Sequence, residues 1–341
     1  VSAHYEADVV TAASVAVVDA PTANVDAITS ATQLDDVRHT VGGGIDVGGD
    51  LSRITLGYAY GFESDYRSHG ISLSGRTELF DRNTILEASY GRGFDSVCGL
   101  AQPDDREATD RQRLPSSDGC FEAADRESRD LSIQTFQGGI TQVWTPVVVT
   151  QITLTAQTLN GYQGNPYRGV WLGRSAAEEH HPENRARYAA GIGTRLWIEP
   201  LSGALQVDAR IYRDTWDIES LTTDVGYEQS IAEGIVFRMR GRFYAQSGAA
   251  FYSDDYVFAP KGQYFTGDRE LSPMRAWTFG GKFDWEVPAG EDGSVLGFME
   301  SFRLILKGDV ILSDFVDFHY GAVDVPNTTA LVGTLSMNAA F

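Results

Sequence analysis

Three arginines occupy alternate positions of the segment FRMRGRFYAQ, residues 237–246. In a strand, alternate side chains point to opposite faces, so Arg238, Arg240 and Arg242 share one face while Phe237 and Met239 share the other. A soluble sheet would turn the apolar face toward a core. A membrane barrel turns that face toward lipid and turns the charges toward a wet interior, where a row of cations attracts anions.

A second group of residues with possible chemistry is His4, which shares a strand face with Glu6 and Asp8 in HYEADVV. This combination could perform acid–base catalysis. No Ser or Cys nucleophile can be placed beside it, so we expect a hydrogen-bond network instead. The sequence therefore predicts no enzyme and no cofactor.

Two adjacent histidines raise the possibility of a metal site. His180 and His181 in AEEHHPEN could ligate a metal together with Glu178, Glu179 and Glu183. An exposed, solvated loop is the interpretation that we prefer, and we expect no metal there.

The polar segment 97–128 is rich in Asp and Glu and contains both cysteines of the chain. Clustered carboxylates could bind calcium, but the D-x-D-x-D-G spacing is absent. Cys98 and Cys120 are predicted to form a disulfide in an oxidising compartment, with a pair of unrelated thiols as the alternative. The preferred interpretation is a disulfide-tied extracellular lid.

The elements that must position these residues are strands, because apolar and polar residues alternate with a period of two along the whole chain. RITLGYAYGF, for example, sets Ile54, Leu56 and Tyr58 against Thr55 and Gly57. The pattern occurs in fourteen segments: 1–11, 37–48, 53–63, 67–80, 84–96, 129–144, 148–162, 185–199, 204–215, 219–231, 235–250, 273–287, 298–318 and 330–341.

One of these segments has an irregular pattern. In 129–144, Leu131 and Ile133 disagree in parity with Phe136 and Ile140. We expect a β-bulge to separate the two pairs.

The connections between the segments alternate in length. Short linkers with turn residues occupy every second connection, at 49–52, 81–83, 145–147, 200–203, 232–234 and 288–297. All of the long linkers fall at the other end, at 12–36, 97–128, 163–184, 251–272 and 319–329. Outer-membrane barrels have short periplasmic turns and longer extracellular loops, so the long linkers are predicted to be extracellular.

Composition agrees with a barrel. The chain has 341 residues and a formal charge of −20, which argues against a nucleic-acid partner. Abundant Gly and aromatic residues, 36 Gly and 15 Tyr among them, suit many strands and tight turns. The last segment ends at Phe341, which resembles the C-terminal signal read by the barrel assembly machinery.

The sequence thus predicts an all-β fold: one transmembrane antiparallel β-barrel domain of the outer-membrane type over residues 1–341, with about fourteen strands. An even strand number lets the first and last strands pair and close the sheet without an edge. The lumen-lining charged residues are predicted to be Arg238, Arg240, Arg242, Glu228, Asp224, Asp208, Arg210, Lys282, Asp284, Glu286, Arg303 and Lys307. If the turn IAEGI places Ile231 opposite Ile235, then Glu228 faces Arg238 and Asp224 faces Arg242.

Five motifs in order give the chain a family resemblance: HYEADVVTAAS, NPYRGV (165–170), RDTWDI (213–218), AAFYSDDY (249–256) and GDRELS (267–272). Together they resemble the bacterial domain-of-unknown-function family 3570. The resemblance implies an outer-membrane barrel in a bacterial outer membrane, with membrane lipids around it. A small lipoprotein is a possible partner.

Three functional hypotheses follow. The first is a porin-like conduit that transports or exports a small polar solute or product. The second is a structural barrel that anchors a lipoprotein or a cell-surface complex. The third is uptake of a hydrophobic substrate, as in fatty-acid transporters, with SVAVVDAPTANVDAITSA in the role of their N-terminal hatch.

Overall fold

The computed structural model describes residues 1–12, 27–29, 34–100, 121, 126–164, 168–172, 175–254, 262–287, 295, 298–320, 323–324 and 327–340. Among these residues, no helix is long and apolar enough to cross a membrane. The principal element is one antiparallel sheet of fourteen strands. It confirms the predicted all-β fold and its strand number.

The fourteen long strands lie side by side in chain order, so that each pairs with the long strands that come before and after it in the chain. They are β1 (Ser2–Ala12), β3 (Leu34–Gly48), β4 (Ser52–Phe62), β5 (Tyr66–Leu79), β6 (Thr84–Leu100), β7 (Arg126–Thr145), β8 (Val148–Gly161), β11 (Asn184–Ile198), β12 (Gly203–Asp214), β13 (Glu219–Ala232), β14 (Ile235–Gln246), β15 (Met274–Glu286), β16 (Ser301–Phe315) and β19 (Thr328–Ala340).

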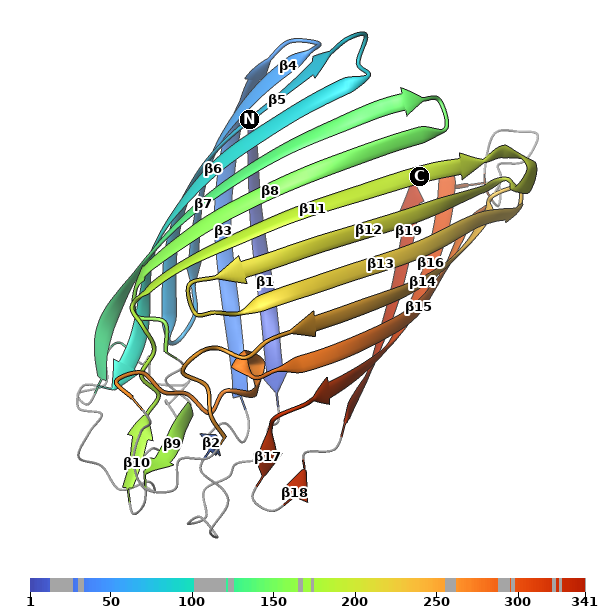
Figure 1. Ribbon diagram of the computed structural model, residues 1–341. Coiled ribbons are helices and arrows are strands. Elements are labelled where there is room, and N and C mark those ends of the chain that lie inside the picture. Colours follow the sequence, from blue (N-terminus) through green and yellow to red (C-terminus); the bar gives the residue numbers. More distant parts are fainter. Residues whose placement is uncertain are drawn as a thin grey trace.

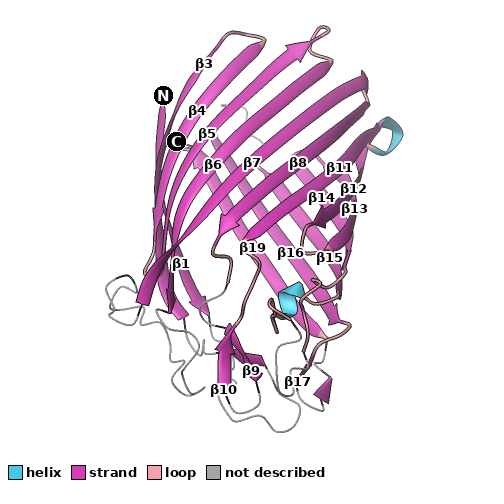
Figure 2. Ribbon diagram, turned by 60° about the vertical axis from the view of Figure 1, so that its left-hand side comes forward, coloured by secondary structure: helices cyan, strands magenta, loops and turns pink. Residues whose placement is uncertain are grey.

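The strands tilt and curve around an interior to form the wall of a barrel (Figures 1 and 2). Val1 and the end of β19 lie at the end with the short turns, as expected (Figure 1). The described residues contain no ladder between β1 and β19, so the expected hydrogen-bonded closure is not part of the described sheet.

Short elements gather at the opposite end of the barrel, where the long loops lie (Figure 1). These are β2 (Ala27–Thr29), β9 (Arg168–Leu172), β10 (Ser175–Glu178), β17 (His319–Tyr320), β18 (Val323–Asp324) and the 3-10 helix η4 (Arg269–Leu271), whereas the 3-10 helix η3 (Glu199–Leu201) forms a turn at the other end. Strands β10, β9 and β2 make a small separate sheet.

Two details of register differ from the sequence-based predictions. Leu131 to Gln142 of β7 pair with β6 and β8 without interruption, so the bulge expected there is absent and Leu131 and Ile133 simply face the interior. A register shift lies instead at Val143/Thr145. Leu131 lies opposite Asp95 on the polar face. Apolar residues on this face break the alternating pattern, and this was wrongly interpreted as a bulge.

The sheet has an apolar outer face and a polar inner face. Outward side chains such as Ile192, Ile211, Val225, Met239 and Phe279 are 49–61% exposed, although a soluble protein would bury them. A belt of exposed apolar side chains on a curved antiparallel wall is the arrangement of a transmembrane barrel, whose strands need about 9–11 residues to cross the bilayer. The protein is therefore an outer-membrane β-barrel, and the polar face is its lumen.

Candidate functional site: a charged lumenal wall beneath a loop cap

The arginine segment forms β14, and its register follows the predicted arithmetic. Glu228 of β13 lies opposite Arg238, and Asp224 lies opposite Arg242. The turn itself differs, because Ala232 pairs with Ile235 and a bulge lies between Ser230 and Ala232. The predicted pairing of Ile231 with Ile235 is therefore wrong, although the ladder beyond the bulge has the expected register.

The arginines of β14 share the lumenal face with charged residues of the next two strands. Arg238 lies in one row with Lys282 of β15 and Lys307 of β16. On this face the three strands carry six basic residues and only three acidic ones: Arg238, Arg240, Arg242, Lys282, Arg303 and Lys307 against Asp284, Glu286 and Asp309. We call this surface the basic wall.

One acidic residue of the basic wall was missed by the sequence analysis. Asp309 of β16 accepts a hydrogen bond from Arg240 Nε at 3.0 Å and lies 3.1 Å from Lys307 Nζ. It reaches Arg240 across β15, because Gly280 lies between the two strands in the same row. The period-two pattern places Asp309 on the inner face and could have identified it.

Gly280 makes this contact possible by leaving its place in the row empty. A Cβ at this position would lie 2.0 Å from Asp309 Oδ1, closer than two non-bonded atoms can approach. Gly193 leaves a similar space for Asp208, whose Oδ1 would be 2.2 Å from a Cβ there. In both places an acidic side chain lies flat over the neighbouring strand instead of projecting into the lumen.

A second ion-pair group lies nearer the short-turn end. Asp284 of β15 accepts hydrogen bonds from Arg303 Nε and Nη2, both at 2.7 Å, and from Lys282 Nζ at 2.9 Å. A bidentate guanidinium–carboxylate contact is geometrically specific. Asp284 is therefore fixed between two cations, as predicted in kind, although its partners are Arg303 and Lys282 and not the arginines of β14.

The other predicted neutralising partners make different contacts. Arg238 donates from Nη2 to Gln206 Oε1 at 3.0 Å, and no ion pair with Glu228 is found in the described part of the chain. Arg242 lies opposite Asp224 in the register, but the described residues contain no ion pair between the two. Neighbouring positions in a ladder set the opportunity for contact, but long side chains reach diagonally to better partners.

Asp208, Arg210 and Asp224 lie together beside the basic wall. They line a small inner pocket of about 170 Å³ with Thr222 and Thr153. Asp208 accepts a hydrogen bond from Gln206 Nε2 at 2.6 Å and lies directly opposite Asp224 in the ladder. The lumen is thus mixed in sign, as predicted, and two of its acids face each other across β12 and β13.

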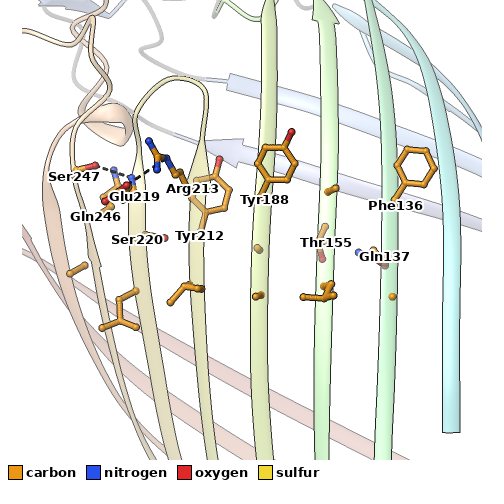
Figure 3. A pocket seen from close by; sticks show the side chains of 18 residues that line it. Phe136, Gln137, Thr155, Tyr188, Tyr212, Arg213, Glu219, Ser220, Gln246 and Ser247 are labelled. Atoms are coloured by element: carbon orange, nitrogen blue, oxygen red, sulfur yellow. Dashed lines mark hydrogen bonds and ion pairs between the residues drawn. The ribbon is translucent and has the colours of Figure 1, made fainter.

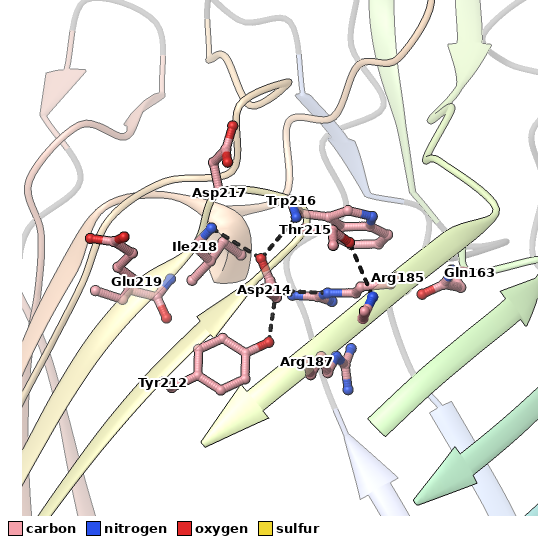
Figure 4. A network of polar contacts seen from close by, with 12 residues as sticks. Gln163, Arg185, Arg187, Tyr212, Asp214, Thr215, Trp216, Asp217, Ile218 and Glu219 are labelled. Atoms are coloured by element: carbon pink, nitrogen blue, oxygen red, sulfur yellow. Dashed lines mark hydrogen bonds and ion pairs between the residues drawn. The ribbon is translucent and has the colours of Figure 1, made fainter. Parts of the chain in front are cut away.

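A compact cap of loop residues lies at the long-loop end, and a buried ion pair holds it to the barrel (Figure 4). Asp214, at the end of β12, accepts hydrogen bonds from Arg185 Nε at 2.8 Å and Tyr212 Oη at 2.7 Å. It also accepts from the backbone N–H groups of Trp216 and Ile218, at 2.9 and 3.0 Å. The Asp214 side chain is fully buried, and these donors satisfy it.

Aromatic packing extends the cap from this ion pair. The Arg185 guanidinium lies 3.9 Å from the centre of the Trp216 ring, and Trp216 packs edge-on against Phe251 at 5.1 Å. Trp216, Ile218 and Ala249 form a buried apolar cluster here. The cap therefore joins the β12–β13 turn to the β14–β15 loop.

Glu179 and His181 tie a third loop into the cap. Glu179 Oε1 accepts a hydrogen bond from Gly267 N at 3.0 Å, and Glu179 Oε2 lies 3.5 Å from His181 Nε2. Burial lowers the pKa of His181, but the Glu179 carboxylate and the Gln163 carbonyl outweigh it, so the pKa of His181 is raised above its usual range. Backbone hydrogen bonds also join His180 to Phe265 in both directions.

This placement corrects the expectation of a solvated loop. Glu179 and His181 are only 5% and 8% exposed, although His180 remains at the surface. The hydrophilic run AEEHHPEN gave no sign that two of its charged residues would pack together. Within the described ranges, no three His, Cys, Asp or Glu side chains come together in a way that could hold a metal.

Several predicted features lie wholly or partly beyond the described residues. Cys98 is fully buried at the end of β6, but Cys120 lies outside the described residues, so their disulfide stays a prediction. Phe341 and most of the hatch-like segment 14–31 are also outside them, as is most of segment 97–128, the predicted extracellular lid. His4 lies on the inner face over Gly42, and the described part of the chain records no hydrogen bond between it and Glu6 or Asp8.

Comparison with known families gives a match over residues 6–299, to the family described as "Protein of unknown function (DUF3570)". The chain belongs to this family. A search of curated proteins finds no match. In this DUF3570 protein, the motifs RDTWDI, AAFYSDDY and GDRELS contribute to the cap, with Asp214, Phe251 and Gly267 as examples.

Several solved structures are similar to this DUF3570 protein at low sequence identity. The siderophore receptor PirA from Pseudomonas aeruginosa has 8% identity and a TM-score of 0.49, and the match covers 89% of this chain and 51% of the receptor. CdiB from Escherichia coli has 9% identity and a TM-score of 0.46, with 98% and 61% covered. A Pseudomonas aeruginosa FadL homologue has 9% identity and a TM-score of 0.39, with 90% and 76% covered. The chain therefore spans about half the length of the first of these proteins.

Proposed function

We propose that this DUF3570 protein is an outer-membrane conduit for small polar solutes and that its lumen favours anions. The observation that carries the proposal is an inequality of exposure within the ion pairs of the basic wall. The carboxylates of Asp284 and Asp309 are 5–6% exposed, whereas their cationic partners Arg240, Lys282, Arg303 and Lys307 are 29–48% exposed.

This inequality decides what a passing ion meets. The acids are recessed into the wall over glycine or between two cations, and the guanidinium and ammonium groups project beyond them. The local field in a pore acts on a solute more strongly than the distant net charge of the protein. An anion in the lumen is therefore stabilised beside the basic wall, despite the formal charge of −20.

Conductance of the purified full chain in a planar lipid bilayer tests the proposal. We expect discrete openings. In a tenfold KCl gradient, we expect the reversal potential to be shifted from zero toward the equilibrium potential of chloride. A protein that inserts, shows the heat-dependent gel shift of a folded barrel and stays electrically silent would contradict the conduit. A reversal potential shifted toward the equilibrium potential of potassium would contradict the anion preference but not the conduit.

The second candidate is a barrel scaffold, and the cap is the observation that favours it. Three loops are interlocked there by buried polar contacts, which provides a rigid outer surface for a lipoprotein or another cell-surface partner. Silence in the bilayer together with co-purification of a lipoprotein by the intact protein, lost on disruption of the cap, would favour this function over the conduit.

A further inference from the structure

Two of the three lysines in the chain stand opposite each other on the lumenal face of the basic wall. Lys282 of β15 pairs with Lys307 of β16 in the ladder, and Lys261 is outside the described residues. We call Lys282 and Lys307 the lysine pair. Like charges directly opposite each other destabilise a sheet. An anion bound at the lysine pair would relieve this repulsion, and the compact ammonium group of lysine is a common ligand of phosphate.

Both lysines belong to the same short pattern, a lysine followed two positions later by an aspartate. The pattern occurs as Lys282 and Asp284 on β15, and as Lys307 and Asp309 on β16. The two strands are antiparallel, so the register brings the lysines together and carries the aspartates to opposite sides of the pair. Each ammonium group lies close to its own aspartate, at 2.9 and 3.1 Å. One such contact leaves each ammonium group further N–H donors for a ligand.

An arginine completes each half of this arrangement. Arg303 of β16 lies 2.7 Å from Asp284, and Arg240 of β14 lies 3.0 Å from Asp309. Each aspartate is thus shared by two cations, so each half has one positive charge in excess. The two carboxylates are recessed behind these cations. A solute in the lumen therefore meets two excess positive charges, one from each half, where the lysines adjoin.

We propose that the lysine pair binds the doubly charged phosphate group of a small solute, either inorganic phosphate or a phosphate monoester. A dianion balances both halves at once, whereas chloride balances only one. Both ammonium groups donate to phosphate oxygens, and such charge-assisted hydrogen bonds are about twice as strong as neutral ones. The inference rests on the proposed anion preference of the lumen and names the anion that the basic wall holds.

A larger hollow on the outer face of the barrel offers an anion no comparable site. This groove has a volume of about 1130 Å³, and its lining includes Phe136 and Tyr188 (Figure 3). Among its lining residues the one cation is Arg213, which lies 3.6 Å from the carboxylate of Glu219. The groove therefore has no excess of positive charge, in contrast to the surroundings of the lysine pair.

The protein groups around the lysine pair keep their charge across the range in which a phosphate monoester titrates. On the lumenal face they are Asp224 and Glu228 of β13, Arg238, Arg240 and Arg242 of β14, Asp284 and Glu286 of β15, and Arg303 and Asp309 of β16, while the described part of β19 adds no titratable side chain on this face. Carboxylates, ammonium groups and guanidinium groups ordinarily titrate below about pH 5 or above about pH 10. The second pKa of a phosphate monoester is about 6, so a change of affinity near this pH reports the charge of the ligand.

Isothermal titration calorimetry of the purified full chain in detergent tests the proposal, with glycerol 3-phosphate and inorganic phosphate as separate probes. We expect saturable binding to the wild type and to Arg275→Gln, whose arginine lies on the outward face of β15. Lys282→Gln and Lys307→Gln should each weaken binding about tenfold or more, because a hydrogen bond to a charged group contributes about that factor. Lys282→Arg keeps the charge and should retain most of the affinity.

A pH profile of the wild type needs no variant and carries the test if a variant lacks the gel shift of a folded barrel. Between about pH 7.5 and pH 5, the affinity for glycerol 3-phosphate should fall about tenfold, since only about a tenth of the ester keeps its second charge at the lower pH. Sulfate stays doubly charged and should bind equally well at both. Binding of glycerol 3-phosphate alone would assign the site to a phosphate monoester, and binding of inorganic phosphate alone would assign it to free phosphate.

Three results would overturn the inference. One is the absence of saturable binding of either probe to the folded wild type. Another is an affinity of folded Lys282→Gln and Lys307→Gln equal to that of Arg275→Gln. The third is a loss of sulfate affinity at low pH as large as that of the ester, which would assign the titration to the protein. Calorimetry does not depend on conduction, so none of these results contradicts the conduit, whereas a barrel that binds phosphate and stays electrically silent contradicts the conduit alone.

Discussion

Replacing the three arginines of β14 by glutamine should shift the ion selectivity of the lumen toward cations. On the inner face of β14–β16, the change removes three of six basic residues and leaves the three acidic ones. The basic wall then loses its excess of positive charge, while glutamine keeps most of the side-chain volume and some hydrogen-bonding capacity. We expect the barrel to fold, because Asp309 retains Lys307 as a partner at 3.1 Å.

The magnitude follows from Coulomb's law. In a water-filled lumen, a unit charge about 7 Å away contributes about 0.6 kcal/mol, so three contribute about 1.8 kcal/mol. Screening over a Debye length of about 10 Å at 0.1 M salt reduces this to about 1 kcal/mol. Anions lose an attraction and cations lose a repulsion of this size, so the permeability ratio should change by about tenfold or more.

The assay is the reversal potential in a tenfold KCl gradient, measured on single channels. An ideally selective pore gives about 59 mV in either direction, and a tenfold change in permeability ratio moves the potential by tens of millivolts within about that range. Arg275→Gln is the matched control, because Arg275 lies on the outward face of β15, where it pairs with Asp314. A triple variant with wild-type conductance and an unchanged reversal potential would refute the assignment of the basic wall to the ion path.

Three further predictions concern stability. Gly280→Leu should expel the Asp309 carboxylate and destabilise the barrel by about 1–3 kcal/mol in urea titrations, whereas Gly308→Leu, at a position with open space around its Cβ, should have little effect. Asp214→Ala leaves Arg185 buried without its partner and should cost the cap about 3–5 kcal/mol, so limited proteolysis should cleave near residues 214–218 much faster; unchanged cleavage would contradict the role of this ion pair. Because the pKa of His181 is raised in the folded cap, its stabilising contribution is complete below about 6.5, the value expected for an unfolded His, and is lost as pH rises through the folded value. Hydrogen exchange of the Gly267 amide should therefore gain protection at acid pH beyond the intrinsic rate change, and His181→Gln should remove that gain.

The fold was predictable because each strand of a membrane barrel faces lipid on one side and a wet interior on the other, so its sequence alternates between apolar and polar residues. Alternation, turn chemistry and the sorting of loop lengths by end each report a property of single strands or single turns. The register of β13 and β14 was also within reach, since one short turn fixes a ladder of charged pairs. The bulge within that turn could shift Ile231 without disturbing Arg238, because the extra residue is absorbed before the ladder begins.

The candidate site was only partly predictable. The alternating pattern shows to which face of the sheet a side chain points. The partner of a long side chain also depends on which neighbouring positions carry glycine and so leave space. Arg240 contacts Asp309 two strands away because Gly280 intervenes, and no pattern within one strand shows this. The cap was still less visible: Glu179 and His181 are buried by loops distant in the sequence, so their hydrophilic surroundings indicated a solvated loop.

The flat-lying acids of the lumen have a consequence for how this gene can change. The Asp309 side chain fills the space that a side chain at position 280 would need, and Asp208 does the same at position 193. In each case the glycine and the acid lie on neighbouring strands. A larger residue at either glycine is tolerated only if the acid opposite it is shortened or lost, and at position 309 that second change exposes the two cations that Asp309 had balanced, Arg240 and Lys307. Suppressor selections that begin from Gly280→Leu should therefore recover second-site changes at position 309, and the surviving lineages would carry an altered lumenal charge as the by-product of a packing repair.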